Sequence, residues 1–438
     1  MIKKTQLLLL FLLAGLIATA QQPLTLSSAI SKALENNYDI KIIRNKQRIA
    51  EINNNWGQAG RYPYINFSLA SNNSYNMPEG ENYTNNIFTG GPGISWTLFD
   101  GFSVKITKQR YEELENQSKN NTITLLESTI QSVVLAYYTV LLEKEKLEVY
   151  KGLMSVSEDR YEQALQRKEI GSYVTYDVLQ AKNSYLSDRS DYLSQEVAYK
   201  NALRDLNYLM AEKSNVAYTL VDSFKAIPAD YSLEELQAQM MESNRNLQSQ
   251  YINQRLLEKA VALAKSDFSP SLNFAGGLTG TSTRTAYKNS GSSWANSASL
   301  YGNLTLSFNL FSGGTKRRAL QIARINEESG IIEIEQKKLD LLNNLSNVFE
   351  YYEVRKELLN VAEENLKAAQ LNLQISKDKF ENGAINSFNY RDVQNVYLNA
   401  AITKLQAVYN FIDTQTSLLR LTGAIMQEYE TEESLQSE

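Results

Sequence analysis

The sequence of 438 residues contains neither cysteine nor histidine, the side chains that many enzymes and metal sites use. Without cysteine we expect no disulfide, no thiolate nucleophile, no cysteine–zinc site and no lipid on an N-terminal cysteine. Without histidine, a Ser-His-Asp triad and an HExxH zinc motif are impossible. The 44 basic and 49 acidic residues nearly balance, which gives no global reason to expect a nucleic-acid partner.

Carboxylate or lysine chemistry is possible by composition, but no motif supports it. The sequence has no GxxxxGK[ST] phosphate-binding loop and identifies no carboxylate pair in a cleft. Possible metal ligands are carboxylates and seven methionines, of which Met240 and Met241 are adjacent. We therefore predict no catalytic residue, no cofactor and no metal site, and a protein that is not an enzyme.

Residues 1–20 have the pattern of a secretory signal peptide. Lys3 and Lys4 precede an apolar segment at 7–17, and residues 18–20 (Ala-Thr-Ala) form a small-x-small cleavage site. A membrane-anchoring helix is the alternative, but the apolar segment is short for spanning a bilayer. No later segment has 18 consecutive apolar residues, so we expect an exported chain without a later transmembrane helix.

The two halves of the chain repeat one another. The offset between matching residues is 207 positions early in the repeat and 212 positions later. Matching pairs are Pro63 and Pro270, Phe67 and Phe274, Gly101 and Gly313, and Gly171 and Gly383. Such self-similarity predicts two copies of one structural unit of roughly 200 residues.

Long helices are indicated by missing prolines and by heptad stripes. The stripes comprise Leu126, Val133, Val140, Leu147, Met154 and Tyr161 in the first half, and Ile331, Lys338, Leu345, Tyr352, Leu359, Leu366, Leu373 and Phe380 in the second. A period of seven predicts a left-handed supercoil. At 1.5 Å per residue, a helix over 101–168 would be ~100 Å long, which helices over 39–60 and 173–211 laid end to end would nearly match.

Shorter amphipathic helices are expected over 25–37 and 232–244. Ser232 followed by Glu235 has the sequence of a capping box, in which the serine side chain accepts a bond from the helix backbone.

Four segments alternate apolar and polar residues with period two, which predicts strands. No lysine or arginine lies between Arg61 and Lys105. The alternating spans are ~10 residues long, about what a tilted membrane-crossing strand needs. The segments 71–88 and 280–298 are rich in Asn, Ser, Gly and Thr, which is typical of surface loops. Trp96 suits the aromatic belt of a membrane barrel, and Trp294 falls in one of these polar loops.

Four strands cannot close a membrane barrel, because the smallest such barrels have about eight. A membrane-facing hairpin cannot leave its edges unpaired, so the chain is expected to oligomerise with a copy number that physics leaves open. The alternative is two ordinary hairpins on a soluble core, which would make the protein a periplasmic coiled-coil structural protein. Fractionation distinguishes the two.

Taken together, these features resemble the TolC-like outer membrane efflux protein family over essentially the whole mature chain. The resemblance rests on the signal peptide, the duplicated unit, Leu98-Phe99-Asp100-Gly101 with its counterpart at 310–314, and the two glycine-containing turns beginning at Gly171 and Gly383. It implies an α-helical and membrane β-barrel fold: a homotrimer with a 12-stranded barrel in the bacterial outer membrane and a long α-helical tunnel in the periplasm.

The resemblance implies an exit duct of a tripartite efflux pump or of a type I secretion system. The partners would be a periplasmic adaptor (membrane fusion) protein, an inner membrane transporter of the proton-driven or ABC type, and outer membrane lipid. A duct dedicated to metal-ion efflux is the alternative within transport, because the other components would select the cargo.

The predicted organisation has five parts. These are the signal peptide 1–20; a first repeat 21–211 with strands 62–76 and 86–100 and helices 101–168 and 173–211; an equatorial linker 212–231; a second repeat 232–423 with strands 269–283 and 299–312 and helices 313–381 and 386–422; and an acidic tail 424–438.

The resemblance also assigns roles to the two turns, which would lie at the periplasmic tip. The expected adaptor-contact residues are Ile170, Gly171, Ser172, Tyr173 and Val174, and Asn382, Gly383, Ala384 and Ile385. The expected gate residues are Asp177, Asn389 and Asp392, with Asn389 replacing one acidic residue, together with Phe380, Ile385 and Tyr173. Because Phe380 and Ile385 stand where studied relatives have Tyr or Arg, we predict an apolar constriction in place of a polar link. For Asp177 and Asp392 the alternative is a structural role at a helix N-terminus.

Overall fold

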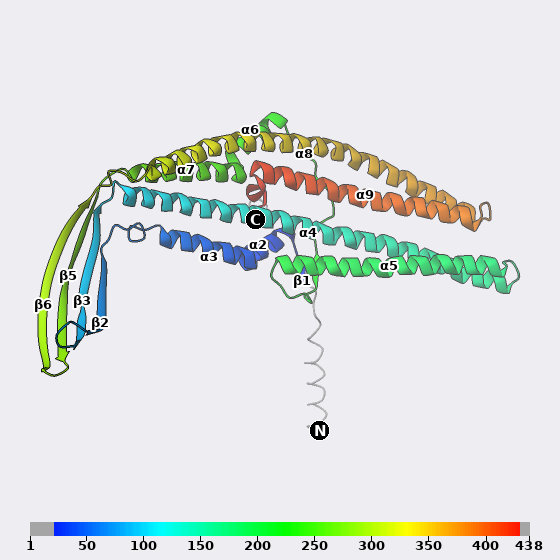
Figure 1. The fold of residues 1–438 in the computed structure, drawn as a ribbon. Coiled ribbons are helices and arrows are strands. Elements are labelled where there is room, and N and C mark those ends of the chain that lie inside the picture. Colours follow the sequence, from blue (N-terminus) through cyan, green and yellow to red (C-terminus); the bar gives the residue numbers. More distant parts are fainter. Residues whose placement is uncertain (1–21, 430–438) are drawn as a thin grey trace, which may run out of the picture. The chain divides into compact units, whose positions relative to one another are not determined.

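A computed structural model describes residues 22–429 (Figure 1). The predicted signal peptide and residues 430–438 of the predicted tail lie outside the described residues. The chain divides into two compact units. The sheet unit comprises residues 43–122 and 246–338, and the helical unit comprises the residues up to 42, 123–245 and those from 339 onward.

The sheet unit contains a four-stranded antiparallel sheet in the order β2-β3-β5-β6. Its strands are β2 (Tyr64–Asn76), β3 (Tyr83–Phe99), β5 (Ser271–Tyr287) and β6 (Gly291–Ser307). Each repeat contributes one hairpin, and β3 pairs with β5 to join them. Strands β2 and β6 are therefore the edges of the sheet.

The expected surface loops at 71–88 and 280–298 are wrong. Ser74 pairs with Asn85, and Arg284 pairs with Trp294, so the strands continue until only residues 77–82 and 288–290 connect them. Backbone pairing between neighbouring strands does not depend on the side chains, so a Ser- and Asn-rich composition does not end a strand. Trp294 consequently lies in β6 and not in a loop.

The expected end of the last strand is also wrong. Alternation continues to Leu310, but β6 ends at Ser307, which pairs with Ser271. The residue before Ser271 is Pro270, which has no N–H to extend the ladder. Phe308 and Leu310 are exposed beyond the strand.

Four long helices follow the hairpins. They are α4 (Ser103–Glu169), α5 (Thr175–Leu209), α8 (Thr315–Glu381) and α9 (Ser387–Thr422). In the helical unit, the heptad positions Val133, Val140, Leu345 and Tyr352 are fully buried. By length and composition, α4 is the one described helix with an apolar stretch that could cross a membrane, and half of that stretch is buried inside the protein.

Four shorter helices precede the hairpins: α2 (Leu26–Asn36) and α3 (Tyr38–Asn53) in the first repeat, and α6 (Leu233–Ser243) and α7 (Arg245–Ser266) in the second. The expected extent of the helix over 39–60 is wrong, because α3 ends at Asn53. Asn55 donates its side-chain amide to the Ile52 carbonyl and accepts from the Gln58 N–H. These bonds compete with continuation of the helix.

The expected capping box at Ser232 is also wrong. The Ser232 hydroxyl donates to the carboxylate of Glu234 at 3.0 Å and makes no capping bond to the helix backbone. The hydroxyl of Ser232 therefore interacts with Glu234 and not, as the capping-box pattern predicted, with the helix backbone.

Within the helical unit, the linker between the repeats contacts the long helices α4 and α8. Its strand β4 (Tyr218–Leu220) pairs in parallel with β1 (Gln22–Leu24). The hydroxyl of Tyr137 on α4 lies 2.8 Å from the Leu24 carbonyl, and the hydroxyl of Tyr352 on α8 donates to the Ala229 carbonyl at 2.7 Å. Both tyrosine side chains are fully buried, so packing and hydrogen bonds together fix the linker.

Candidate functional site at the paired helix turns

The turns α4–α5 and α8–α9 have the same backbone geometry. Gly171 and Gly383 have φ values of 77° and 72°, in the left-handed region that glycine adopts without a steric cost. In each turn the glycine N–H bonds three residues back and the next N–H bonds five residues back, as Gly171 and Ser172 do to Lys168 and Arg167. These are the two bonds of a Schellman motif, which ends one long helix before the next begins.

The two following helices are capped differently. In the first turn the N–H of Val174 donates to the carboxylate of Asp177 at 3.1 Å. In the second turn the side chain of Asn386 accepts from the N–H of Asn389 at 2.9 Å. Asp177 therefore has a capping role, whereas Asn389 uses only its backbone in this contact.

A hollow of about 340 Å³ lies between the turns and brings together four of the predicted gate residues. They are Tyr173 and Asp177 from the first turn and Phe380 and Ile385 from the second. The other two, Asn389 and Asp392, are exposed on α9 and do not line this hollow.

Arg160 of α4 crosses from the first hairpin to the second. Its guanidinium donates to the Ser387 hydroxyl at 2.6 Å and to the Gln394 side chain at 3.1 Å. It also lies 5.2 Å from the Phe380 ring centre and 5.3 Å from that of Tyr390. Burial lowers the pKa of Arg160, and the neighbouring charge of Arg391 lowers it further, while electrostatic interactions with Tyr390, Tyr173 and Asp188 oppose this shift.

Phe380 and Tyr390 stack with their ring centres 5.0 Å apart and an interplanar angle of 10°. In the first turn, Arg167 similarly donates to the Tyr173 hydroxyl at 3.1 Å and lies over that ring. The aromatic residues predicted to form an apolar constriction therefore each pack against a guanidinium within the same chain.

A second inter-hairpin contact joins α5 to α9. Both guanidinium nitrogens of Arg391 donate to the carboxylate of Asp188, at 2.7 and 2.6 Å. The Asp188 side chain is 1% exposed and that of Arg391 is 23% exposed. A bidentate pair at such a buried position has defined geometry, and removal of one partner would leave a desolvated charge.

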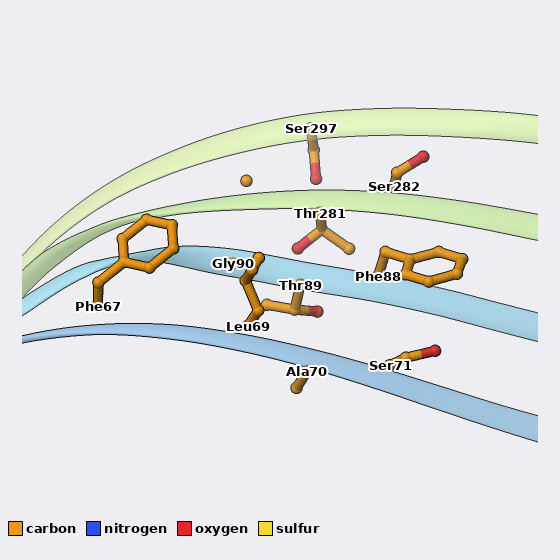
Figure 2. A pocket seen from close by; sticks show the side chains of 11 residues that line it. Phe67, Leu69, Ala70, Ser71, Phe88, Thr89, Gly90, Thr281, Ser282 and Ser297 are labelled. Carbon is orange, nitrogen blue, oxygen red and sulfur yellow. The ribbon is translucent and has the colours of Figure 1, made fainter.

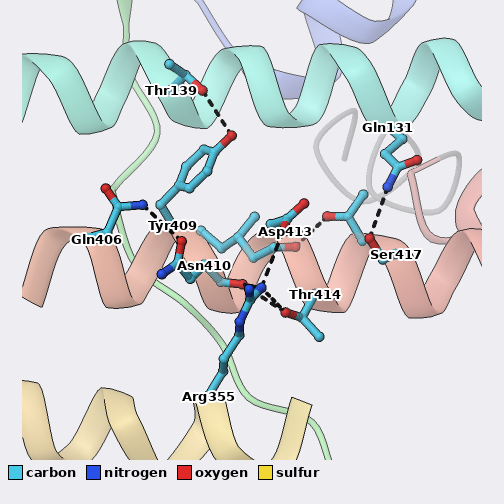
Figure 3. Close-up of polar contacts among 11 residues, drawn as sticks. Gln131, Thr139, Arg355, Gln406, Tyr409, Asn410, Asp413, Thr414 and Ser417 are labelled. Atoms are coloured by element: carbon cyan, nitrogen blue, oxygen red, sulfur yellow. Dashed lines mark hydrogen bonds and ion pairs between the residues drawn. The ribbon is translucent and has the colours of Figure 1, made fainter. Parts of the chain in front are cut away.

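Further contacts tie α9 to α8 and α4 (Figure 3). Arg355 of α8 donates to Thr414 and lies 3.3 Å from the Asp413 carboxylate. From α4, the Gln131 amide donates to the Ser417 hydroxyl at 3.2 Å. Polar contacts therefore connect the two hairpins both near the turns and farther along α9.

The comparison with known protein families decides the identity of the chain. The model of the family described as outer membrane efflux protein matches residues 29–212 and 236–424. The chain belongs to the outer membrane efflux protein family.

Individual relatives agree with this membership. The chain is 23% identical over 365 residues to the probable outer membrane lipoprotein SilC of Salmonella typhimurium, covering 80% of this chain and 74% of SilC. It is 20% identical over 366 residues to the cation efflux system protein CusC of Escherichia coli K12, covering 80% and 76%.

Solved structures of outer membrane channels share the fold. The CmeC channel of Campylobacter jejuni gives a TM-score of 0.74 at 17% identity, covering 91% of this chain and 85% of CmeC. VceC of Vibrio cholerae gives 0.70 at 14% identity, covering 91% and 96%. The predicted family and fold class are confirmed: this outer membrane efflux protein has the fold of channels that join a β-barrel to an α-helical tunnel.

The residues predicted for adaptor contact lie at the surface of the two turns. Ile170 is 77% exposed and Val174 64% exposed. The remaining predicted residues are exposed at Gly171, Ser172, Asn382, Gly383 and Ala384, and half-buried at Tyr173 and Ile385.

Sequence reasoning missed Arg160, Asp188 and Arg391. Arg160 is 227 residues from Ser387, and Asp188 is 203 residues from Arg391. No local pattern singles out these charges, because each has further polar residues one helical turn away and its partner is distant in the sequence.

Proposed function

We propose that this outer membrane efflux protein acts as the exit duct of a tripartite efflux machine, as a passive channel and not as an enzyme. The observation that carries the proposal is the open sheet of four strands, which exposes apolar residues on one face and leaves β2 and β6 as edges. In a membrane, such edges must be paired by further strands.

Three copies would supply 12 strands, with β6 of one chain pairing with β2 of the next. The family resemblance favours this homotrimer, whose long helices would form the periplasmic tunnel. The partners proposed are a periplasmic adaptor protein and an inner membrane transporter of the proton-driven or ABC type, which supplies the energy.

We assign the two turns to the periplasmic tip. The proposed adaptor contacts are the exposed turn residues Ile170, Gly171, Ser172, Tyr173 and Val174, with Asn382, Gly383, Ala384 and Ile385. Their support is the exposed position of both turns, at which the side chains of Ile170 and Val174 are accessible to a partner.

The proposed gate consists of Tyr173, Asp177, Phe380, Ile385, Asn389 and Asp392, to which we add Arg160. Arg160 holds the second turn to the first hairpin, so the gate has a polar link at a position that the sequence did not indicate. Opening would require the loss of these contacts.

The cargo can be a small molecule, a protein or a metal ion. The name of CusC specifies cation efflux, which favours metal ions as the second candidate cargo. No group of three or more acidic residues that could hold a metal ion is present among residues 22–429. A metal-ion duct would therefore depend on its partners for selection.

The test is deletion of the gene in its native host, followed by cargo accumulation assays and complementation. Complementation by the wild-type chain should restore export of a fluorescent dye or a metal ion and place the protein in the outer membrane fraction. Recovery of a functional protein from the soluble periplasm would contradict the channel.

A further inference from the structure

The sheet exposes an apolar face whose members are set by the strand register. Residues directly opposite one another across the strands share a face of the sheet. One such row consists of Leu69, Gly90, Gly280 and Ala298. Large apolar side chains on this face are Ile65, Phe67, Leu69, Phe88, Trp96, Leu278, Leu300, Leu304 and Leu306. All are at least 40% exposed, so in an outer membrane channel this face is the one that contacts lipid.

A hollow of about 620 Å³ interrupts this face (Figure 2). Phe67, Leu69 and Phe88 line it, while Gly90 and Gly280 supply positions without side chains. No charged residue lines it. By the strand register, the lining side chains on this face are apolar except for Ser71 and Ser282, and the open access suits an acyl chain.

The glycines account for the hollow. A Cβ at Gly90 would lie 2.3 Å from Leu69 Cδ2, so any larger residue there would displace the side chain of Leu69. A Cβ at Gly280 would have only the Gly90 carbonyl within 4 Å, at 3.6 Å. Position 280 therefore has space that a ligand or a larger side chain could occupy.

One end of the hollow leads to a positive charge. Ser71, Phe88 and Ser282 line that end, and Arg284 is the next residue of β5 on the same face. Arg284 is the only charged residue in the four strands, and it makes no ion pair among residues 22–429. Its guanidinium lies 5.8 Å from the ring centre of its cross-strand partner Trp294.

A mostly apolar hollow that leads to a positive charge suits an amphiphile with an apolar chain and an anionic headgroup. Two same-face steps separate Gly280 from Arg284, about 13 Å along a strand. We propose that the hollow and Arg284 bind one anionic lipid of the outer membrane, with an acyl chain against Gly280 and Phe67 and the headgroup phosphate at Arg284. The charge of Arg284, which makes no ion pair among residues 22–429, selects the anionic headgroup, and the hollow selects a lipid over free phosphate.

The experiment measures lipid binding to the full-length oligomer purified in a non-ionic detergent. Dimyristoyl phosphatidylglycerol and dimyristoyl phosphatidylcholine, which differ in headgroup charge, are titrated and bound lipid is counted by native mass spectrometry. We expect one phosphatidylglycerol per chain, held at least about tenfold more tightly than phosphatidylcholine, as one charge-assisted contact would give. Millimolar inorganic phosphate should not compete.

Two variants test the two halves of the site. Arg284→Gln should remove the preference for phosphatidylglycerol. Gly280→Leu should lower the affinity for both lipids by about tenfold because the leucine side chain fills the hollow. Two control variants should bind lipid as the wild type does. Lys288→Gln removes a nearby exposed cation in the β5–β6 connection, and Gly302→Leu changes a residue on the same face outside the hollow.

Equal binding of the two lipids by the wild type, or competition by phosphate, would overturn the proposal. So would unchanged binding in both Arg284→Gln and Gly280→Leu, with the far-UV circular dichroism of each variant confirming a folded oligomer.

Discussion

The two helical hairpins have closely similar backbones but differ in how their tips are held. The long helices α4 and α8 each contain 67 residues, and both hairpins turn through a left-handed glycine. The contacts between them are not reciprocal. Arg160 reaches from the first hairpin to Ser387, while its counterpart in the second repeat is Asn372, 212 positions later.

The ion pair between the hairpins also occurs only once and is not repeated by the equivalent residues. Asp188 and Arg391 correspond to Ala400 and Leu179 in the other repeat, so a second copy of the pair is absent. The two repeats share the backbone and the turns, but the polar contacts made by Arg160 and Asp188 have no counterpart in the other repeat.

The largest expected effect comes from breaking the buried ion pair. Asp188→Ala leaves Arg391 without its carboxylate and should destabilise the paired hairpins by about 3 kcal/mol, near the lower end for a buried pair because Arg391 is partly exposed. Hydrogen exchange of the α5 and α9 amides measures this loss. Lys182→Ala, an exposed charge on the same helix, is the matched control.

Arg160→Ala should have the next largest effect. It removes two charge-assisted hydrogen bonds and the contacts with the Phe380 and Tyr390 rings, worth about 2 kcal/mol together. If these contacts oppose opening, the open population should rise by more than about tenfold, seen as higher conductance in planar bilayers. Asn372→Ala should leave the conductance unchanged, and an equal response from both variants would contradict the difference between the hairpins.

The caps differ by a smaller amount. Asp177→Ala and Asn386→Ala should each cost about 1 kcal/mol, because each removes the side chain that caps its helix. Asn389→Ala should cost almost nothing, since Asn389 contributes its backbone N–H. Limited proteolysis at the two turns compares the three variants, and a large effect at Asn389 would assign that side chain another role.

The smallest effect on stability is expected for Asp392→Asn. Asp392 is exposed and has no hydrogen bond or ion pair within the described part of the chain, so the change in free energy should stay within about 0.5 kcal/mol. If an acidic ring forms at the tip, cation selectivity in planar bilayers should nevertheless fall. Unchanged selectivity and unchanged blockage by multivalent cations would remove Asp392 from the gate.

The sequence predicted the elements that depend on local or periodic patterns. Heptad stripes indicated the long helices, and Gly171 and Gly383 indicated turns, because a left-handed residue is a strictly local requirement. The ends of the strands were harder to predict from the sequence. The ladder continues through Ser- and Asn-rich segments such as 71–76 because the partner strand is present, and partner length is not a local property.

The caps show the same limit on a smaller scale. Asp177 and Asn389 occupy equivalent positions, and the sequence alone left the role of Asp177 open between gate and cap. The structure places its carboxylate on the Val174 N–H, while Asn386 caps the second helix. This explains why an acidic residue is not needed at position 389: the preceding cap residue already carries a suitable side chain.

By itself the sequence determined the duplicated unit, the α-helical and β-strand segments and the family resemblance, because repeat offsets and periodicities are properties of the chain. Only the tertiary structure decided which charges meet. Arg160 with Ser387, and Asp188 with Arg391, are more than 200 residues apart, and no local pattern encodes such a pairing. The same holds for the hollow at Gly90 and Gly280, which exists because the strand register sets two glycines side by side.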